Sequence, residues 1–131
     1  MPSKRIVVIN DNAVFLDFMQ ELLCQEGYET ITWRDADTAH AMVAREMPDL
    51  VILDIRMERP DSGLIILELL RLDPKTTEIP VIICSADLAF LRQQVDHLRT
   101  LRCDVQEKPF RLDDLLGKVT AFIGPAEGVE R

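Results

Sequence analysis

The chain has 131 residues, enough for one domain with a core of its own, and its hydrophobic and charged fractions, 47% and 29%, are ordinary for a globular protein. The formal net charge of −8 disfavours non-specific binding to nucleic acid, which requires clustered lysine and arginine. No apolar run approaches the roughly 20 residues that span a bilayer, and the N-terminal segment is too short for a secretory signal, so we expect a cytoplasmic protein that contacts neither nucleic acid nor membrane.

The first half of the chain predicts alternating strands and helices. A strand is expected at residues 5–9 and a helix at 13–25, where apolar side chains recur at helical spacing and Gly27 provides a stop. A second strand at 28–33 and an alanine-rich helix at 36–46 follow. The alternation of elements therefore begins at the N-terminus.

The second half continues the same order. The expected strands are residues 50–54, 80–84 and, more weakly, 104–107, and the expected helices are 62–72, 88–102 and 112–123. In helix 88–102 the pattern places Leu88, Leu91, Val95 and Leu98 on one side. Strand followed by helix, five times over, predicts an α/β fold: a doubly wound parallel sheet with helices on both faces. We expect this domain to cover residues 1–124, and residues 125–131 to form a flexible tail.

Polar side chains are expected to converge at one edge of that sheet. In an open α/β sheet, ligands bind beyond the carboxyl ends of the strands. The first strand ends at Asn10 and Asp11, the third at Asp54 and the fourth at Ser85, while Lys108 follows the fifth. Two acids, a hydroxyl and an amine therefore meet at one rim, although they come from four separate places in the chain.

Each of these groups suits phosphoryl chemistry. Asp11 and Asp54 are hard oxygen donors of the kind that Mg²⁺ takes in ones and twos. Asp54 ends an apolar run, so it is partly desolvated, and beside Mg²⁺ it can accept a phosphoryl group as a nucleophile. Ser85 can donate a hydrogen bond to a phosphoryl oxygen, and Lys108 supplies a positive charge to the same group. Pro109 can hold the Lys108 loop through a cis bond.

These motifs resemble the receiver domain of two-component response regulators, in its stand-alone form. The matching pieces are "VVIND", "LVILDIRM", "DSGL", "VIICSA" and "EKPF", and the similarity covers about residues 4–123. Each piece alone is weak, whereas all five in order and at the family's spacing are specific. The resemblance implies a flavodoxin-like sheet of five strands in the order 2-1-3-4-5.

The resemblance also assigns roles to individual residues. It implies that Asp54 is the phospho-acceptor, charged by a histidine kinase or phosphotransfer protein, and that Ser85 is the switch hydroxyl and Lys108 the phosphate-binding lysine. Asp11 and Asp54 are then ligands of Mg²⁺, together with the backbone carbonyl of Arg56. Asn10 replaces the second acid of the family, which reaches the metal through water, so we expect weaker Mg²⁺ binding and not its loss.

Further departures from the family concern switching and the lifetime of the phosphorylated state. Val105 stands where the family often has a tyrosine or phenylalanine that moves inward on activation, so any switching relies on Ser85 and the loop that follows. Arg56 and Asp87 flank the expected phosphoryl group and can pair across it. We therefore expect slow self-dephosphorylation at most, and no enzymatic turnover of a separate substrate. Glu58, in a loop one residue longer than the common form, can face Lys108 or simply be solvated.

Two surface expectations remain. In helix 62–72 an outer apolar stripe of Ile65, Leu69 and Leu72 is expected, which is either a partner surface or the seat of a neighbouring loop. The three cysteines are expected to be reduced, small and buried side chains: Cys24, Cys84 and Cys103.

The sequence thus favours a phospho-accepting receiver whose readout is a downstream protein partner or a homodimer. The alternative is a pseudo-receiver, which keeps the fold and binds partners without phosphorylation, as Asn10 and Val105 would allow. A phosphatase with an aspartyl nucleophile is disfavoured because it needs an acid two residues after Asp54, where Arg56 stands. A flavin-binding protein is disfavoured because no phosphate-binding loop rich in serine, threonine and glycine follows the first strand.

Overall fold

The structure of the chain is a computed structural model that describes residues 4–55, 57 and 62–125. Strands and helices alternate along these residues, except that two helices follow one another between residues 88 and 100, and outside that segment the bounds are close to those predicted. The elements are β1 Arg5–Ile9, α1 Ala13–Gln25, β2 Glu29–Trp33, α2 Ala36–Glu46, β3 Leu50–Asp54, α3 Ser62–Leu72, β4 Val81–Ser85, α4 Leu88–Gln93, α5 Val95–Thr100, β5 Asp104–Glu107 and α6 Leu112–Ile123.

The five strands form one parallel sheet in the order β2-β1-β3-β4-β5, which confirms the predicted fold. The central strands are nearly continuous apolar runs because both of their faces are covered, and β4 is buried at every position. In the register, Ile9 lies beside Leu53, and Ser85 lies beside Glu107. The carboxyl ends of β1, β3, β4 and β5 therefore reach the same edge of the sheet.

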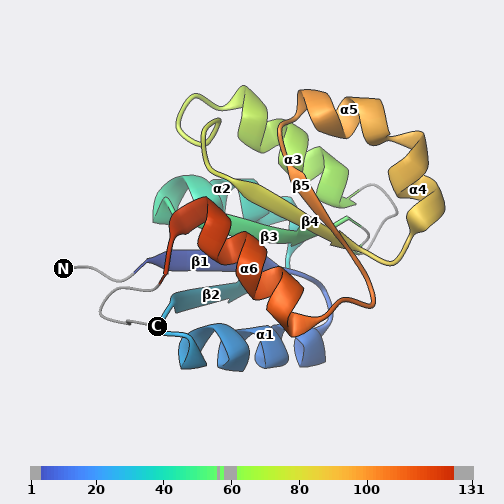
Figure 1. Cartoon of the computed structure of the whole chain (residues 1–131). Coiled ribbons are helices and arrows are strands. Elements are labelled where there is room, and N and C mark those ends of the chain that lie inside the picture. Colours follow the sequence, from blue (N-terminus) through green and yellow to red (C-terminus); the bar gives the residue numbers. More distant parts are fainter. Residues whose placement is uncertain (1–3, 56, 58–61, 126–131) are drawn as a thin grey trace.

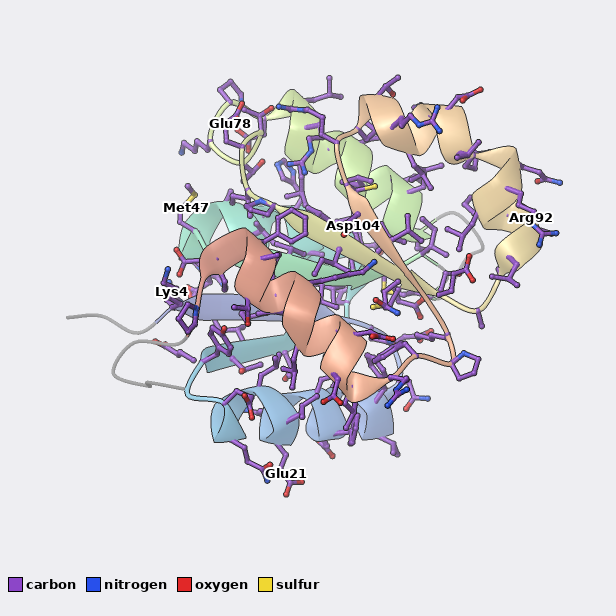
Figure 2. All side chains as sticks on the ribbon, viewed as in Figure 1. Lys4, Glu21, Met47, Glu78, Arg92 and Asp104 are labelled. Carbon is purple, nitrogen blue, oxygen red and sulfur yellow. The ribbon has the colours of Figure 1, made fainter. Side chains whose placement is uncertain are left out.

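Two hydrophobic clusters lie on opposite faces of the sheet. Figure 1 shows α1 and α6 against one face, and α2, α3, α4 and α5 against the other. Alternate residues of one strand enter different clusters, as the two-residue period of a strand requires: Ile6 and Val8 face α1 and α6, whereas Val7 and Ile9 face the opposite layer. The charged side chains of the helices, such as Glu21 on α1 and Arg92 on α4, extend outward (Figure 2).

The single helix predicted at residues 88–102 is wrong, because the chain forms two short helices there. α4 ends at Gln93, and Gln94 has a φ of −104° before α5 begins at Val95. The break lets Leu91 and Leu98 both reach the core, while Leu88 and Val95, expected on the same side, remain 38% and 47% exposed. Because α4 and α5 run in different directions (Figure 1), the four side chains do not share one helix face as they would in a single straight helix.

The outer stripe predicted on α3 is confirmed. Ile66, Leu67 and Leu70 are buried against the sheet, while Ile65 and Leu69 are exposed, as is Leu72. The prediction that all three cysteines are buried is wrong for Cys24, which is exposed near the end of α1; Cys84 is buried and Cys103 is half-buried. The apolar pattern of a helix does not show which of its apolar residues stay exposed because no other element covers them.

Some predictions fall outside the described residues, namely those on Arg56, on Glu58 and on the tail beyond residue 125. Among the residues that the structure describes, none of the helices combines the length and the apolar character needed to cross a bilayer.

Candidate functional site

A cavity of about 420 Å³ lies at the carboxyl edge of the sheet, where the polar residues were predicted to meet. Its walls are formed by Asp54, Ser85, Ala86, Asp87 and Lys108. Three of the predicted site residues therefore share one cavity, although they lie on β3, on β4 and after β5. Parallel strands bring their carboxyl ends to one edge, so this convergence follows from the topology.

The Lys108 ammonium faces the Asp54 carboxylate across this cavity. The distance between Lys108 Nζ and Asp54 Oδ2 is 3.8 Å, close enough for an ion pair and too long for a hydrogen bond. The two side chains are 24% and 14% exposed, so water screens the pair only in part. The peptide bond between Lys108 and Pro109 is cis, as the sequence suggested.

Backbone contacts place the Lys108 loop against the end of β4. The Lys108 N–H donates to the Ser85 carbonyl at 2.8 Å, which extends the β4–β5 ladder by one hydrogen bond. Ser85 itself is buried, and its hydroxyl oxygen accepts a hydrogen bond from the Asp87 N–H at 3.0 Å. The serine predicted to be the switch hydroxyl is thus also the first anchor of the turn into α4.

Asp87 begins α4 as its N-cap. Its carboxylate accepts a hydrogen bond from the Phe90 N–H at 3.0 Å, which satisfies one of the free donors of the first helical turn. Asp87 therefore joins the cavity wall to α4. Its predicted pairing with Arg56 involves a residue outside the described ones.

The end of β1 is ordered by Asn10. Asn10 is only 2% exposed, and its side-chain oxygen accepts a hydrogen bond from the Asn12 N–H at 2.9 Å. Asn12 in turn caps α1 by accepting from the Phe15 N–H at 3.1 Å. The amide at position 10 therefore has a structural role in the turn, in addition to the water-mediated metal contact predicted for it.

Asp11 follows Asn10 and is half-buried at the same edge, but it does not line the cavity that Asp54 shares with Lys108. The residues that the structure describes include no group of three or more His, Cys, Asp or Glu side chains that could hold a metal ion. Two carboxylates supplemented by backbone oxygen and water suit Mg²⁺, which keeps much of its hydration shell. Asp11 and Asp54 are therefore carboxylate donors of the type that could hold Mg²⁺ at this edge.

Two neighbours of the site were missed in the sequence. The ring of Phe15 lies 4.5 Å from Lys108 Nζ, measured to its centroid, although its spacing indicated only a core residue of α1. Gly63 packs so closely on the end of β3 that a Cβ there would lie 2.1 Å from the Asp54 carbonyl oxygen. The "DSGL" motif contains this glycine, but nothing in the sequence shows the close approach.

Cys84 directly precedes Ser85 in β4 and is buried on the face covered by α1 and α6. Burial raises the pKa of its thiol to about 12, and the nearby Lys108 ammonium acts in the opposite direction. At neutral pH the thiol is therefore protonated and behaves as a small apolar side chain.

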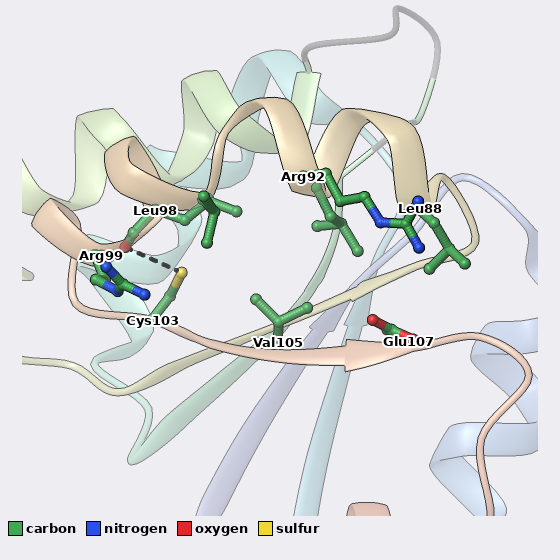
Figure 3. A pocket seen from close by; sticks show the side chains of 9 residues that line it. Leu88, Arg92, Leu98, Arg99, Cys103, Val105 and Glu107 are labelled. Atoms are coloured by element: carbon green, nitrogen blue, oxygen red, sulfur yellow. Dashed lines mark hydrogen bonds between the residues drawn. The ribbon is translucent and has the colours of Figure 1, made fainter.

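A second cavity, a hollow of about 380 Å³, lies beside Val105 between β5 and the α4–α5 pair (Figure 3). It is lined by Leu88, Leu91, Arg92, Val95, Leu98, Arg99, Cys103, Val105 and Glu107. Figure 3 shows the small Val105 side chain below the α4–α5 pair, with space between them. A larger side chain at position 105 would occupy this space.

The comparisons with known proteins agree with this geometry. The family model of the response regulator receiver domain matches residues 6–120. The chain is 34% identical to the response regulator PleD of Caulobacter vibrioides over 114 residues, which are 87% of this chain and 24% of PleD, so it spans about a quarter of that relative. It is 26% identical to the polar-differentiation response regulator DivK of Brucella ovis, over 95% of this chain and 99% of DivK.

Solved structures give the same result. The receiver domain of NtrX from Brucella abortus superposes with a TM-score of 0.77 at 32% identity, over 90% of this chain and 97% of that domain.

Proposed function

This chain belongs to the response regulator receiver domain family, and we propose that it is a phospho-accepting receiver of a two-component phosphorelay. Mg²⁺-dependent phosphorylation of Asp54 then changes the protein's contacts with other proteins. The observation that carries the proposal is the single cavity in which the Asp54 carboxylate, the Ser85 side chain and the Lys108 ammonium meet.

The proposed step is an in-line displacement at phosphorus. A carboxylate oxygen of Asp54 forms a bond to phosphorus while the bond from phosphorus to the donor histidine nitrogen breaks. The electron pair of that bond returns to the imidazole, which takes a proton, and Asp54 is left as an acyl phosphate. The Lys108 ammonium lies where it can stabilise the phosphoryl oxygens, and the Ser85 hydroxyl can donate to one of them. Bound Mg²⁺ would neutralise further negative charge on the transferred group.

The two carboxylates have separate roles in this proposal. Asp54 is the nucleophile, and Asp11 holds the cation beside it. With Asn10 in place of an acid, the site has one fewer negative charge, so Mg²⁺ affinity is lower than a third carboxylate would allow. The chain accepts a phosphoryl group, and its only turnover is slow self-dephosphorylation.

The partners follow from the same chemistry. The phosphoryl group comes from a histidine kinase or a histidine phosphotransfer protein, and the readout is a protein partner or a second copy of this chain.

One competing function has an observation in its favour. The Asn10 side-chain oxygen accepts a hydrogen bond within the β1–α1 turn, and Val105 leaves a hollow where the family often has an aromatic ring. These features favour a pseudo-receiver that binds partners regardless of phosphate. The meeting of Asp54 and Lys108 favours the phosphorylated receiver.

The test is an intact-mass measurement after incubation with Mg²⁺ and acetyl phosphate. We expect one phosphoryl adduct on the wild type and none on Asp54→Asn, which keeps the shape of the side chain and removes its nucleophilic charge. Omitting Mg²⁺ should also prevent the adduct. A folded wild-type protein that takes no phosphoryl group from acetyl phosphate or from a histidine phosphotransfer protein would contradict the proposal and favour the pseudo-receiver.

A further inference from the structure

The position of the Lys108 ammonium is defined by two groups of different chemistry. On one side the Asp54 carboxylate oxygen is 3.8 Å away, beyond hydrogen-bond distance. On the other side the Phe15 ring centroid is 4.5 Å away, within the range of a cation–π contact. The ammonium therefore lies between a carboxylate and an aromatic ring.

The Phe15 ring is placed by the turn that precedes it. Buried Asn10 holds the Asn12 backbone, and the Asn12 side chain holds the Phe15 N–H, so two successive hydrogen bonds connect Phe15 to the end of β1. The ring also packs against the hydrophobic cluster of α1 and α6. Its location is set by the strand end and the core together, independently of Lys108.

A ring is well suited to hold an ammonium that must bind a phosphoryl group. The face of an aromatic ring carries partial negative charge and attracts a cation, yet it accepts no strong hydrogen bond. A carboxylate at the same place would hydrogen-bond the ammonium and compete with phosphoryl oxygens for it. The ring limits the positions that the flexible lysine side chain can take and leaves its N–H donors available.

We propose that Phe15 is a positioning residue for Lys108, holding the ammonium beside Asp54 where it meets the oxygens of the phosphoryl group. This inference rests on the proposed function, because it concerns the same site. In this proposal Phe15 acts on the phosphoryl group only through Lys108.

The experiment measures the binding of beryllium fluoride, a phosphoryl mimic, by calorimetry at saturating Mg²⁺. The variants are Phe15→Leu and Phe15→Met, which keep an apolar side chain without a ring face, and Phe15→Tyr, which keeps the face. We expect the leucine and methionine variants to bind beryllium fluoride about threefold to tenfold more weakly, while tyrosine stays close to the wild type.

Two further measurements separate positioning from packing. Mg²⁺ affinity measured without beryllium fluoride should stay within about twofold of the wild type in all three variants, because a cation–π contact to Lys108 does not act on the metal carboxylates. In a Lys108→Met background, Phe15→Leu should cause no additional loss, since the group that it positions is gone.

The outcomes distinguish this inference from the proposed function. If the wild type forms neither a beryllium fluoride complex nor a phosphoryl adduct, the proposed function fails and the role of Phe15 fails with it. If the wild type does both and the leucine and methionine variants bind as tightly as it does, only the inference is overturned. It is also overturned if tyrosine loses as much affinity as leucine, or if the loss persists without Lys108.

Discussion

The two sides of the candidate site are packed differently. On the Lys108 side, α1 and α6 cover the sheet with buried apolar residues, and Phe15 lies directly beside the ammonium. On the Ser85 side, the α4–α5 pair leaves a hollow of about 380 Å³ above Val105. The Lys108 side therefore holds its charged group in a defined place, whereas on the Ser85 side α4 and α5 bury only one side chain each, Leu91 and Leu98.

This difference suggests where a phosphoryl group would change the structure. Ser85 connects through the Asp87 N–H to the start of α4, so a movement of its hydroxyl reaches the loosely packed segment. Close-packed interiors resist displacement, whereas a segment over a hollow can shift at lower cost. We expect the α4–α5 segment to move on phosphorylation and the α1–α6 layer to stay in place.

The largest expected effect comes from placing a methyl group at Gly63, in the layer that contains α3. Gly63→Ala would bring a Cβ to 2.1 Å from the Asp54 carbonyl oxygen and 2.5 Å from the Ile55 Cα, and both are backbone atoms. The end of β3 or the start of α3 must then shift, so we expect a loss of about 3 kcal/mol in the free energy of unfolding, measured in urea.

Gly117→Ala is the matched control in α6. A Cβ at Gly117 meets nothing within 4 Å, and the residue is exposed in mid-helix, so we expect a gain of roughly 0.5–1 kcal/mol. A similar change in stability for both variants would show that the close approach at Gly63 does not constrain the strand end.

A second substitution compares the two packings directly. Val8→Ala removes a fully buried side chain that faces α1 and α6, and we expect a loss of about 2 kcal/mol. Val105→Ala removes the same atoms beside the hollow, where fewer contacts exist, so the loss should stay below about 1 kcal/mol. Equal losses in denaturant titrations would mean that the two sides are equally well packed.

The third prediction concerns the contacts that hold the less densely packed side. The Arg71 guanidinium donates hydrogen bonds to four carbonyl oxygens, those of Thr77, Ile79, Leu101 and Arg102, and so ties α3 to the segments before β4 and after α5. Burial lowers the pKa of Arg71, with the nearby Arg102 acting in the same direction.

Arg71→Lys keeps a cation but cannot span these carbonyls, because an ammonium lacks the planar fork of a guanidinium. We expect a loss of about 1–2 kcal/mol in the free energy of unfolding. Arg102→Lys, at a more exposed side chain, is the control and should change it by less than about 0.5 kcal/mol. A larger loss for Arg102 than for Arg71 would contradict this assignment.

The smallest effect is expected in the reactivity of the cysteine thiols. Cys84 and Cys103 lie on opposite sides of the sheet, so each reports on the packing of its own side. In a Cys24→Ser background, Cys103 lines the hollow and Cys84 is buried facing α1 and α6. Burial raises the pKa of Cys103 to about 11 and that of Cys84 to about 12, so both should react slowly at neutral pH and faster as the pH rises, since the thiolate is the nucleophile.

Cys103 should react faster than Cys84 with a disulfide reagent such as 5,5′-dithiobis(2-nitrobenzoic acid). Adding beryllium fluoride with Mg²⁺ should change the rate at Cys103 and leave Cys84 unaffected. A change in reaction rate confined to Cys84 would contradict the expectation that the α4–α5 segment moves and the α1–α6 layer stays in place.

Most of the fold and the meeting of the site residues could be predicted from the amino-acid sequence. Apolar runs indicated β1, β3 and β4, with β5 predicted more weakly, and the positions of Asp54, Ser85 and Lys108 at strand ends predicted that they would meet. These inferences succeed because the two-residue and 3.6-residue periods are local properties, and because parallel strands bring their carboxyl ends to one edge.

Other features depended on contacts between distant segments. The break at Gln94, the exposure of Cys24, the hollow at Val105 and the Phe15 ring beside Lys108 have no local signature. Each arises from how far a helix extends over the sheet and which side chain of another element lies opposite it. A periodic pattern specifies the face that a helix buries, but only the packed structure specifies which residues of other elements this face meets. In this chain the helical spacing predicted Phe15 as a core residue, and only the packed structure shows that its ring also contacts Lys108.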